Sequence, residues 1–369
     1  MLAKSTVVML PCVILLYCWW KRGRIALPDL AASAAFFAVS LGLGWVTLWF
    51  EHVRAIGSAV APVEGLFPRS VAAGLGVFFY LAKCLWPTGL MPIYPRWTVN
   101  PPTLLQLLAW PALVVLLGFF WTKRATWGRS VLFGLGCFLV NLAPVIGLIP
   151  MAYLRLAWVA DHFAYLPLAG LTILAGLGLD ALARRLAPQP RALVATGAAA
   201  LGLVLASESR SYGRVFASPE AMWTRTLELN PGAATAWTEL ALVRYDQGRL
   251  DDAIADNRRA LRLQPDDEEA HNNLGVALAH TGRPDEALAE YRQALQLKPD
   301  DVNARCNFGN ALLGAGRPDE AVVQYEEALR LKPDLPEGHY NLGLALRLLG
   351  RAREADAQLA AAARLSAAP

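Results

Sequence analysis

The chain has 369 residues, 55% of them hydrophobic, and a mean hydropathy of +0.35. This composition excludes an ordinary soluble globular protein and indicates a membrane protein. Residues 1–230 hold 18 basic and 8 acidic residues, a net charge of +10, whereas residues 231–369 hold 16 and 22, a net charge of −6. The contrast predicts a basic membrane domain followed by an acidic soluble domain. A nucleic-acid partner is not expected, because the basic residues stand in short loops between apolar runs, as the positive-inside rule describes.

A helix needs about 20 apolar residues to cross the hydrocarbon core of a bilayer. The sequence therefore predicts an all-α chain that begins with a polytopic transmembrane helix bundle in residues 1–210. The expected spans are residues 5–20, 30–50, 104–121, 131–150, 164–182 and 192–207. The first span is followed by Lys21-Arg22-Gly23-Arg24 without a small-residue cleavage site, so it is not a cleavable signal peptide.

The most basic short loops are Lys21–Arg24, Lys123–Arg129 and Arg184–Arg191. Because positive loops stay in the cytoplasm, residues 51–102, residues 151–163 and the whole C-terminal domain are expected outside it. The apolar segment 71–86 is then interfacial or re-entrant. Lys83 agrees with this, since a cation at the bilayer centre costs about 2.5–3.5 kcal/mol. Alternatively, residues 71–86 span the membrane and one basic loop faces outward.

The second outer loop carries the densest polar cluster of the membrane half: Arg155, Asp161, His162 and Tyr165. The span before it ends in Pro144, Gly147 and Pro150, which weaken a helix. Interrupted helices at membrane depth are tolerated where they line a cavity. The cluster is therefore either an outward-facing polar pocket or an interfacial loop with an Asp–His hydrogen bond.

The sequence contains no motif for a metal, a disulfide framework or a nucleotide. The five cysteines are odd in number, three of them lie in apolar spans, and no CxxC occurs. Neither GxxxxGK[ST] nor a GxGxxG after a strand is present. A soluble nucleotide-sugar site is therefore not expected, and no residue is proposed as a metal ligand.

Residues 234–369 repeat with a period of 34. The recurring positions are Pro231, Pro265, Pro299 and Pro333; Gly248, Gly282, Gly316 and Gly350; Ala253, Ala287, Ala321 and Ala355; and Ala260, Ala294, Ala328 and Ala362. This is the period of the tetratricopeptide repeat, in which paired helices stack into a solenoid. We expect four repeats, at 234–267, 268–301, 302–335 and 336–369. Residues 211–233 are expected to form a connector with a degenerate half-repeat at Pro219–Leu229.

A column of asparagines recurs at the repeat period in the first helix of three repeats, at Asn273, Asn307 and Asn341. Equivalent positions in stacked repeats face the same way. An amide both donates and accepts hydrogen bonds, so such a column can hold a peptide backbone without reading its side chains. Glu239 takes this position in the first repeat. The alternative is that the asparagines only cap or pack within their own repeats.

Two stretches of the membrane half resemble a known family. They are Phe79–Trp97 (FYLAKCLWPTGLMPIYPRW) and Asn141–Leu168 (NLAPVIGLIPMAYLRLAWVADHFAYLPL). With the repeats behind them, they resemble bacterial membrane proteins with tetratricopeptide repeats. Those proteins are similar to the animal transmembrane and tetratricopeptide-containing O-mannosyltransferases. The resemblance covers nearly the whole chain.

The resemblance implies a multi-pass protein of the bacterial inner membrane with periplasmic repeats. It implies transfer of a hexose from a polyprenyl-phosphate donor, a lipid-linked sugar, to a polypeptide acceptor, and it allows for a divalent metal ion. Arg96, Arg155 and His162 would hold the donor phosphate, since a guanidinium pairs well with phosphate oxygens. Tyr94 and Tyr165 would shape the donor site, and Asp161 is the candidate for a catalytic carboxylate.

The chain also departs from that family. Related enzymes resemble one another in an acidic catalytic residue in the first outer loop, and no segment here corresponds to that loop. Residues 1–11 align by eye with a later helix of the family. We therefore expect an N-terminally truncated chain without the catalytic first-loop acid.

Three functions remain in competition. The first is sugar transfer, which needs a carboxylate to deprotonate or orient the acceptor hydroxyl. The second is a non-enzymatic, membrane-tethered scaffold that binds a partner protein through its repeats. The third, a channel or transporter, would need charges at mid-membrane depth, and Lys83 is the only candidate.

Overall fold

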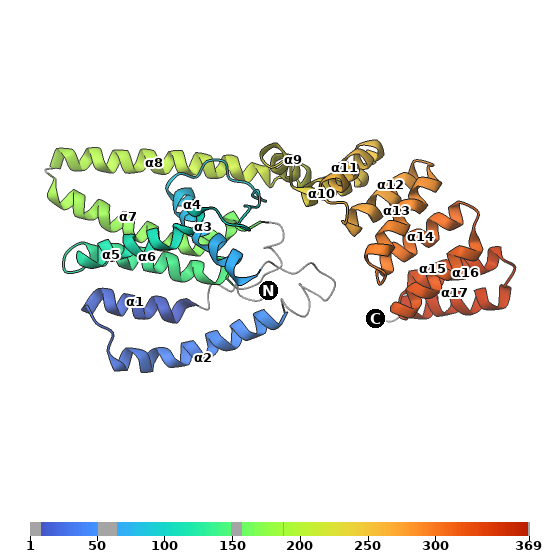
Figure 1. Cartoon of the computed structure of the whole chain (residues 1–369), viewed down its shortest axis with the longest axis horizontal. Helices are drawn as coiled ribbons and strands as arrows, with labels where there is room; N and C mark the ends of the chain where they lie inside the picture. Colours follow the sequence, from blue (N-terminus) through green and yellow to red (C-terminus); the bar gives the residue numbers. More distant parts are fainter. Residues whose placement is uncertain (1–8, 51–64, 149–156, 187, 368–369) are drawn as a thin grey trace. The chain divides into compact units, whose positions relative to one another are not determined.

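The computed structural model describes residues 9–148, 157–186 and 188–367 except for residues 51–64 (Figure 1). The chain divides into two compact units, Met1–Val215 and Phe216–Pro369. Within the described ranges both units are built of helices without strands, which confirms the all-α fold class.

The described residues of the first unit form eight α-helices. They are α1 (Leu10–Arg22), α2 (Leu27–Phe50), α3 (Leu66–Leu85), α4 (Leu104–Leu107), α5 (Ala109–Thr122), α6 (Gly128–Leu142), α7 (Tyr165–Arg185) and α8 (Pro188–Val215). Two 3-10 helices, η3 (Ala143–Val145) and η5 (Asp161–Ala164), follow α6 and precede α7.

Five segments in the described part of the chain are long and apolar enough to cross a membrane. They are Leu27–Val46, Leu104–Thr122, Gly128–Val145, Tyr165–Arg185 and Ala192–Val215. The span expected at residues 5–20 is not among them. Its described part, α1, has 13 residues and is capped at its C-terminal end by Gly23, whose φ is 75°. Residues 1–8 lie outside the description. Helix α3, which covers the segment expected at the interface, is not among them either.

Helix α6 is the most buried helix of the first unit, and it packs closely on α7 through two glycines. A Cβ added at Gly170 would lie 2.5 Å from the carbonyl oxygen of Gly134, and one at Gly134 would lie 2.7 Å from Cβ of Leu174. Small residues that let helix backbones approach are typical of contacts within membranes. Large apolar side chains on α2, α5 and α8 remain exposed, as lipid-facing side chains would be.

The basic turns gather at one end of this unit. The α1–α2, α5–α6 and α7–α8 turns lie together at the left of Figure 1. The indole Nε1 of Trp20 donates to Oγ of Ser130 at 3.2 Å, and a Cβ added at Gly23 would lie 3.1 Å from Nη1 of Arg129. Two of the three basic loops therefore touch one another.

The second unit is a regular stack of helix pairs behind a leading helix, α9 (Pro219–Leu229). The pairs are α10 (Ala234–Asp246) with α11 (Leu250–Leu263), α12 (Glu268–His280) with α13 (Pro284–Leu297), α14 (Val302–Gly314) with α15 (Pro318–Leu331), and α16 (Pro336–Leu348) with α17 (Ala352–Ser366). Each helix packs on the one before and the one after it. Leu227 of α9 packs against Ala236 and Leu240 of α10, so α9 covers the first pair.

The periodic small residues have clear roles in this stack. The turn glycines adopt positive φ angles of 72° to 76° at Gly248, Gly282, Gly316 and Gly350, where a side chain would strain the backbone. The first periodic alanine of every second helix is fully buried, at Ala253, Ala287, Ala321 and Ala355. The 34-residue pattern therefore marks the turns between paired helices and the points where neighbouring helices are in contact.

At one equivalent position in every repeat, a side chain of the first helix contacts the backbone of the loop before it. The residues are Trp237, His271, Arg305 and His339, each within hydrogen-bonding distance of the carbonyl of a proline six residues earlier. At His271 the second ring nitrogen, Nδ1, lies 2.6 Å from Oε2 of Glu290. Both neighbours of this ring are acceptors, so only the doubly protonated imidazole can donate to both. The hydrogen bond with Glu290 accordingly raises the pKa of His271 above its usual value.

This contact predicts a repeat array that loses stability as the pH rises. A histidine whose pKa is raised in the folded state contributes fully below its unfolded pKa of about 6.5, and the contribution disappears as the pH passes the folded pKa. We expect a loss of about 1 kcal/mol, measured as a lower melting temperature of the full chain at pH 9 than at pH 6. Glu290→Gln is the matched control, because it reproduces the neutral pair of His339 with Gln358. An unchanged pH dependence in this variant would contradict the assignment.

Candidate functional site

The Asp161 carboxylate lies at the centre of a hydrogen-bonded cluster in the first unit. It begins η5, directly before α7. The Tyr94 hydroxyl donates to its Oδ1 at 2.7 Å, and the Tyr212 hydroxyl donates to its Oδ2 at 2.7 Å. Three segments that are distant in sequence therefore meet at one carboxylate: the loop after α3, the loop before α7, and the end of α8.

Burial dominates the electrostatics of this cluster. It raises the pKa of the Asp161 carboxyl, while the hydrogen bonds from Tyr94 and Tyr212 act in the opposite direction. Burial also raises the pKa of Tyr94, which keeps its proton. The Lys83 ammonium lies 5.8 Å from the centre of the Tyr94 ring and favours the ionised carboxylate. A buried carboxyl with a raised pKa is a common property of proton-transferring groups, although structural networks share it.

The backbone around Asp161 is held from α3 and from the loop after it. The Tyr80 hydroxyl accepts from the Ala160 amide at 2.8 Å and donates to the Ala160 carbonyl at 3.1 Å. The Trp158 indole donates to the Trp97 carbonyl at 3.0 Å. Residues 157–160 are buried. The loop that presents Asp161 is thus a fixed part of the unit rather than a surface connection.

The structure places the other sequence-predicted residues of this site as follows. The Arg96 guanidinium stacks on the Trp158 ring, 4.7 Å from its centre. Tyr165 heads α7 with an exposed ring. Arg155 and the side chain of His162 lie outside the described residues, so the Asp–His hydrogen bond considered above stays a prediction.

Tyr212 could not be linked to this site from the sequence, because it lies in another helix, 51 residues after Asp161. Among the described residues, no group of three or more His, Cys, Asp or Glu side chains could hold a metal ion. The divalent metal that the family resemblance allows for therefore has no fitting ligand set in this part of the chain.

The second candidate site is the groove formed by the first helices of the repeats, α10, α12, α14 and α16. Its amides are linked across repeats. Asn307 Nδ2 donates to Asn272 Oδ1 at 3.1 Å, and Asn341 Nδ2 donates to Asn310 Oδ1 at 3.1 Å. Asn272 and Asn310 were not singled out from the sequence, although each lies on the same helix as one of the periodic asparagines.

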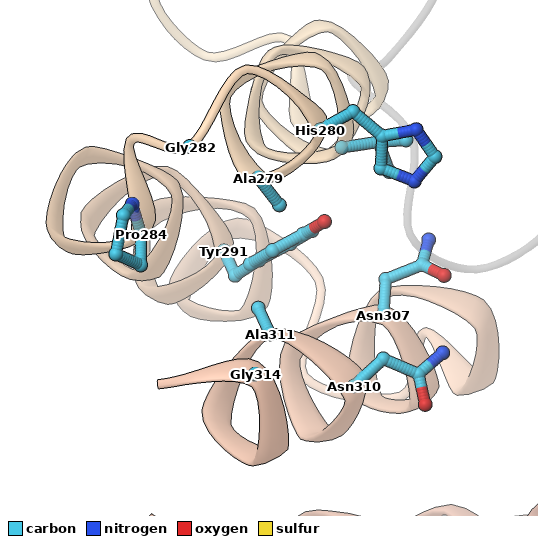
Figure 2. Close-up of a pocket in the computed structure, with 10 residues that line it drawn as sticks. Ala279, His280, Gly282, Pro284, Tyr291, Asn307, Asn310, Ala311 and Gly314 are labelled. Atoms are coloured by element: carbon cyan, nitrogen blue, oxygen red, sulfur yellow. The ribbon is translucent and has the colours of Figure 1, made fainter. Parts of the chain in front are cut away.

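Cavities open along these amides. One of about 520 Å³ is lined by Tyr291 of α13, by His280 and by Asn307 and Asn310 of α14. Figure 2 shows these side chains around one opening, with the Tyr291 ring at its floor. Asn273 and Asn307 line a neighbouring cavity of about 210 Å³, and Asn341 lines a third. All three periodic asparagines therefore border open space while half buried.

Family models agree with this part of the structure. Two models described as tetratricopeptide repeat match residues 266–334 and 306–369, and a third, described as TPR repeat, matches residues 241–282. Residues 241–369 form tetratricopeptide repeats. The repeat architecture predicted from the 34-residue period is thereby confirmed, and all three matches lie within the repeats.

Solved structures of tetratricopeptide-repeat proteins are similar to this part of the chain. A crystal structure of MamA shares 23% identity with a TM-score of 0.39, covering 43% of this chain and 92% of that one. The structure titled YrrB, "a TPR protein with an unusual peptide-binding site", shares 26% identity with a TM-score of 0.36, covering 44% of this chain and 81% of that one. Among curated proteins, none matches the chain.

Proposed function

We propose that the chain is a membrane-anchored protein that holds a polypeptide partner in the groove of its tetratricopeptide repeats. Tetratricopeptide arrays are protein-interaction scaffolds, and their concave surfaces are used for binding. The observation that carries the proposal is the row of linked amides along the cavities. Because Asn272 and Asn310 accept from Asn307 and Asn341, the amides are held in place before a ligand arrives.

Such a row suits an extended backbone. An amide that uses one N–H in an inter-repeat contact keeps a second donor and oxygen lone pairs for a ligand. Pre-positioned groups spare the entropy of ordering them on binding. The apolar wall beside them, with Val276, Ala279 and Ala311, offers space for side chains. A partner held mainly by its backbone would be recognised by its extended conformation more than by its sequence.

Removing the periodic amides tests this function. The triple variant Asn273→Ala, Asn307→Ala and Asn341→Ala is expected to bind an unstructured polypeptide at least tenfold more weakly, since each net hydrogen bond contributes about 1 kcal/mol. Binding would be measured by fluorescence anisotropy with the full chain in lipid nanodiscs and a labelled, unfolded casein probe. Gln293→Ala, an exposed amide on α13, is the control. Equal loss in the control, or no binding by the unmodified chain, would refute the proposal.

We further propose that the five apolar helices anchor the chain in a bacterial inner membrane with the repeats on the periplasmic side. Two basic loops touch at one end of the first unit, and positive loops stay in the cytoplasm. Tyr212, whose hydroxyl reaches Asp161, lies three residues before the end of α8, which supports an exit on the side of the outer loops. Protease digestion of the repeats in intact spheroplasts tests this placement; complete protection would overturn it.

A second candidate function, sugar transfer from a polyprenyl-phosphate donor to the bound polypeptide, is favoured by one observation. Asp161 is a buried carboxyl between two tyrosine hydroxyls, and burial raises its pKa. A carboxylate with a raised pKa accepts a proton from an acceptor hydroxyl more readily at neutral pH. The Arg96 guanidinium is exposed and stacks on the Trp158 ring. Among the described cations it is the nearest in sequence to Tyr94, and it could bind a lipid phosphate.

Asp161→Asn is expected to lower any such transfer by about 10²–10⁴-fold, the usual effect of losing a general base. The assay would follow a radiolabelled hexose from its polyprenyl-phosphate carrier to a polypeptide in proteoliposomes. Tyr212→Phe, which removes one hydrogen bond and keeps the carboxylate, should lose far less. Absence of transfer with the unmodified chain would leave the scaffold function as the complete description.

A further inference from the structure

The first repeat differs from the next two at one buried contact. Counting by 34, Asn257 of α11 corresponds to Tyr291 and Tyr325. Those tyrosine rings lie against glycines: a Cβ added at Gly275 would lie 2.9 Å from Cε1 of Tyr291. The glycine is Ala241 in the first repeat. A short side chain thus stands where the following repeats carry a ring.

The cavity of about 210 Å³ lies where asparagine replaces tyrosine, since Asn257 and Ala241 both line it. Its walls are Ala241, Leu242 and Val276, with the Tyr245 ring and the Asn272 and Asn273 amides at its sides, and Asn257 also lines it. A water molecule takes up roughly 30 Å³ of liquid volume, so the cavity exceeds what one structural water would fill. It opens among the amides of the proposed peptide groove.

Asn257, one of the residues that line this cavity, has a buried side-chain acceptor without a partner. Its side chain is 1% exposed, and Nδ2 donates to the Ala253 carbonyl at 3.1 Å. Its Oδ1 accepts no hydrogen bond from any described residue. A buried acceptor without a donor is unfavourable, so a ligand that brings an N–H or O–H group to this oxygen would bind favourably.

The surroundings favour a cation. Glu239 and Glu269 lie one helical turn from the cavity residues Leu242 and Asn273, on the same helix faces. Neither carboxylate forms an ion pair with a described residue. Burial raises the pKa of both carboxyls, and the negative charge of Glu239 adds to the effect on Glu269. A positive charge placed here would relieve that repulsion.

We propose that this cavity binds a lysine side chain of the polypeptide partner. The methylene stem packs against Ala241, Leu242 and Val276, and the ammonium donates to Oδ1 of Asn257, with Glu239 and Glu269 adding negative charge one helical turn from the cavity walls. Long cationic side chains commonly bury their stem in this way, and the Tyr245 ring adds a face for the cation. This inference rests on the proposed peptide-binding function and adds a residue preference to it.

The test compares two unstructured peptides of alanine, serine and threonine, one with a central lysine and one with norleucine, on the full chain in nanodiscs. Norleucine keeps the stem and lacks the ammonium. We expect about tenfold tighter binding of the lysine peptide, with the difference shrinking at high salt. Equal binding of both peptides would overturn the lysine preference and leave the peptide-binding function standing. Binding of neither peptide would overturn both.

Two double variants and one control variant locate the effect. Ala241→Gly with Asn257→Tyr rebuilds the glycine–tyrosine contact of Gly275 with Tyr291 and fills the cavity. Its melting temperature should stay the same or rise, while the lysine preference disappears. Glu239→Gln with Glu269→Gln should reduce the preference several-fold, whereas Glu327→Gln, which affects an exposed pair with Arg330 on α15, should leave it unchanged. A full lysine preference in the filled variant would place the lysine site elsewhere.

Discussion

Replacing Arg244 by leucine is expected to lower the free energy of unfolding of the repeat array by about 3 kcal/mol. Arg244 pairs with Asp256, whose side chain is fully buried, at an Nη1–Oδ2 distance of 2.5 Å. Without Arg244 the buried carboxylate keeps only Arg259, whose half-exposed guanidinium is 3.3 Å away. Removing one partner of a buried ion pair leaves a charge that the interior solvates poorly, and this is why the expected loss is large.

The measurement is urea unfolding of the full chain, followed by far-UV circular dichroism. The double variant Arg244→Leu with Asp256→Leu removes both charges and should recover most of the stability, since an apolar pair of similar size often matches a buried ion pair. Burial already raises the pKa of Asp256. The deficit of the single variant should therefore shrink on acidification, when the carboxyl takes up a proton. A single variant as stable as the unmodified chain would show that Arg259 alone suffices.

Replacing Gly309 by alanine is the second substitution with a large expected effect. The new Cβ would lie 2.6 Å from Cε1 of Tyr325, whose ring is fully buried. Tyr325 cannot move away easily, because its hydroxyl donates to Oδ1 of Asn310 at 2.6 Å. Overpacking of this kind costs about 1–3 kcal/mol, and it would appear as a lower urea midpoint.

The same helix supplies the control. Gly314 has no heavy atom within 4 Å of an added Cβ, so Gly314→Ala should be neutral or slightly stabilising. A double-mutant cycle isolates the steric contact: in a Tyr325→Asn background, which imitates the pair of Ala241 with Asn257, Gly309→Ala should lose most of its effect. Equal effects in both backgrounds would point to the helix backbone rather than to the ring.

Much of the repeat architecture could be predicted from the sequence, because its determinants are local and recur every 34 residues. The turn glycines and the helix-contact alanines each act within one helix pair, so their spacing reports the fold directly. The same register also contained the exchange of a tyrosine for Asn257, a signal that needs only alignment of the repeats. Its consequence, an unpaired acceptor beside a cavity, required the packing of α10, α11 and α12.

The first unit was less predictable. Hydropathy indicates where apolar helices lie but not their bounds: α6 ends at Leu142 within the stretch expected at residues 131–150, and α8 continues eight residues beyond the expected end at residue 207. Hydropathy does not say which polar side chains converge. The meeting of Tyr94, Asp161 and Tyr212 depends on how three segments fold back on one another, and only the first two stood in loops that were expected outside the cytoplasm.

The stack of helix pairs also determines how the array responds to force. The main contacts join each described helix pair to the pairs beside it, so a force applied to one pair is resisted mainly by its neighbours. Arrays with nearest-neighbour energetics come apart unit by unit rather than all at once. Under tension, the repeats would therefore extend in steps, one helix pair at a time, instead of unfolding in a single event.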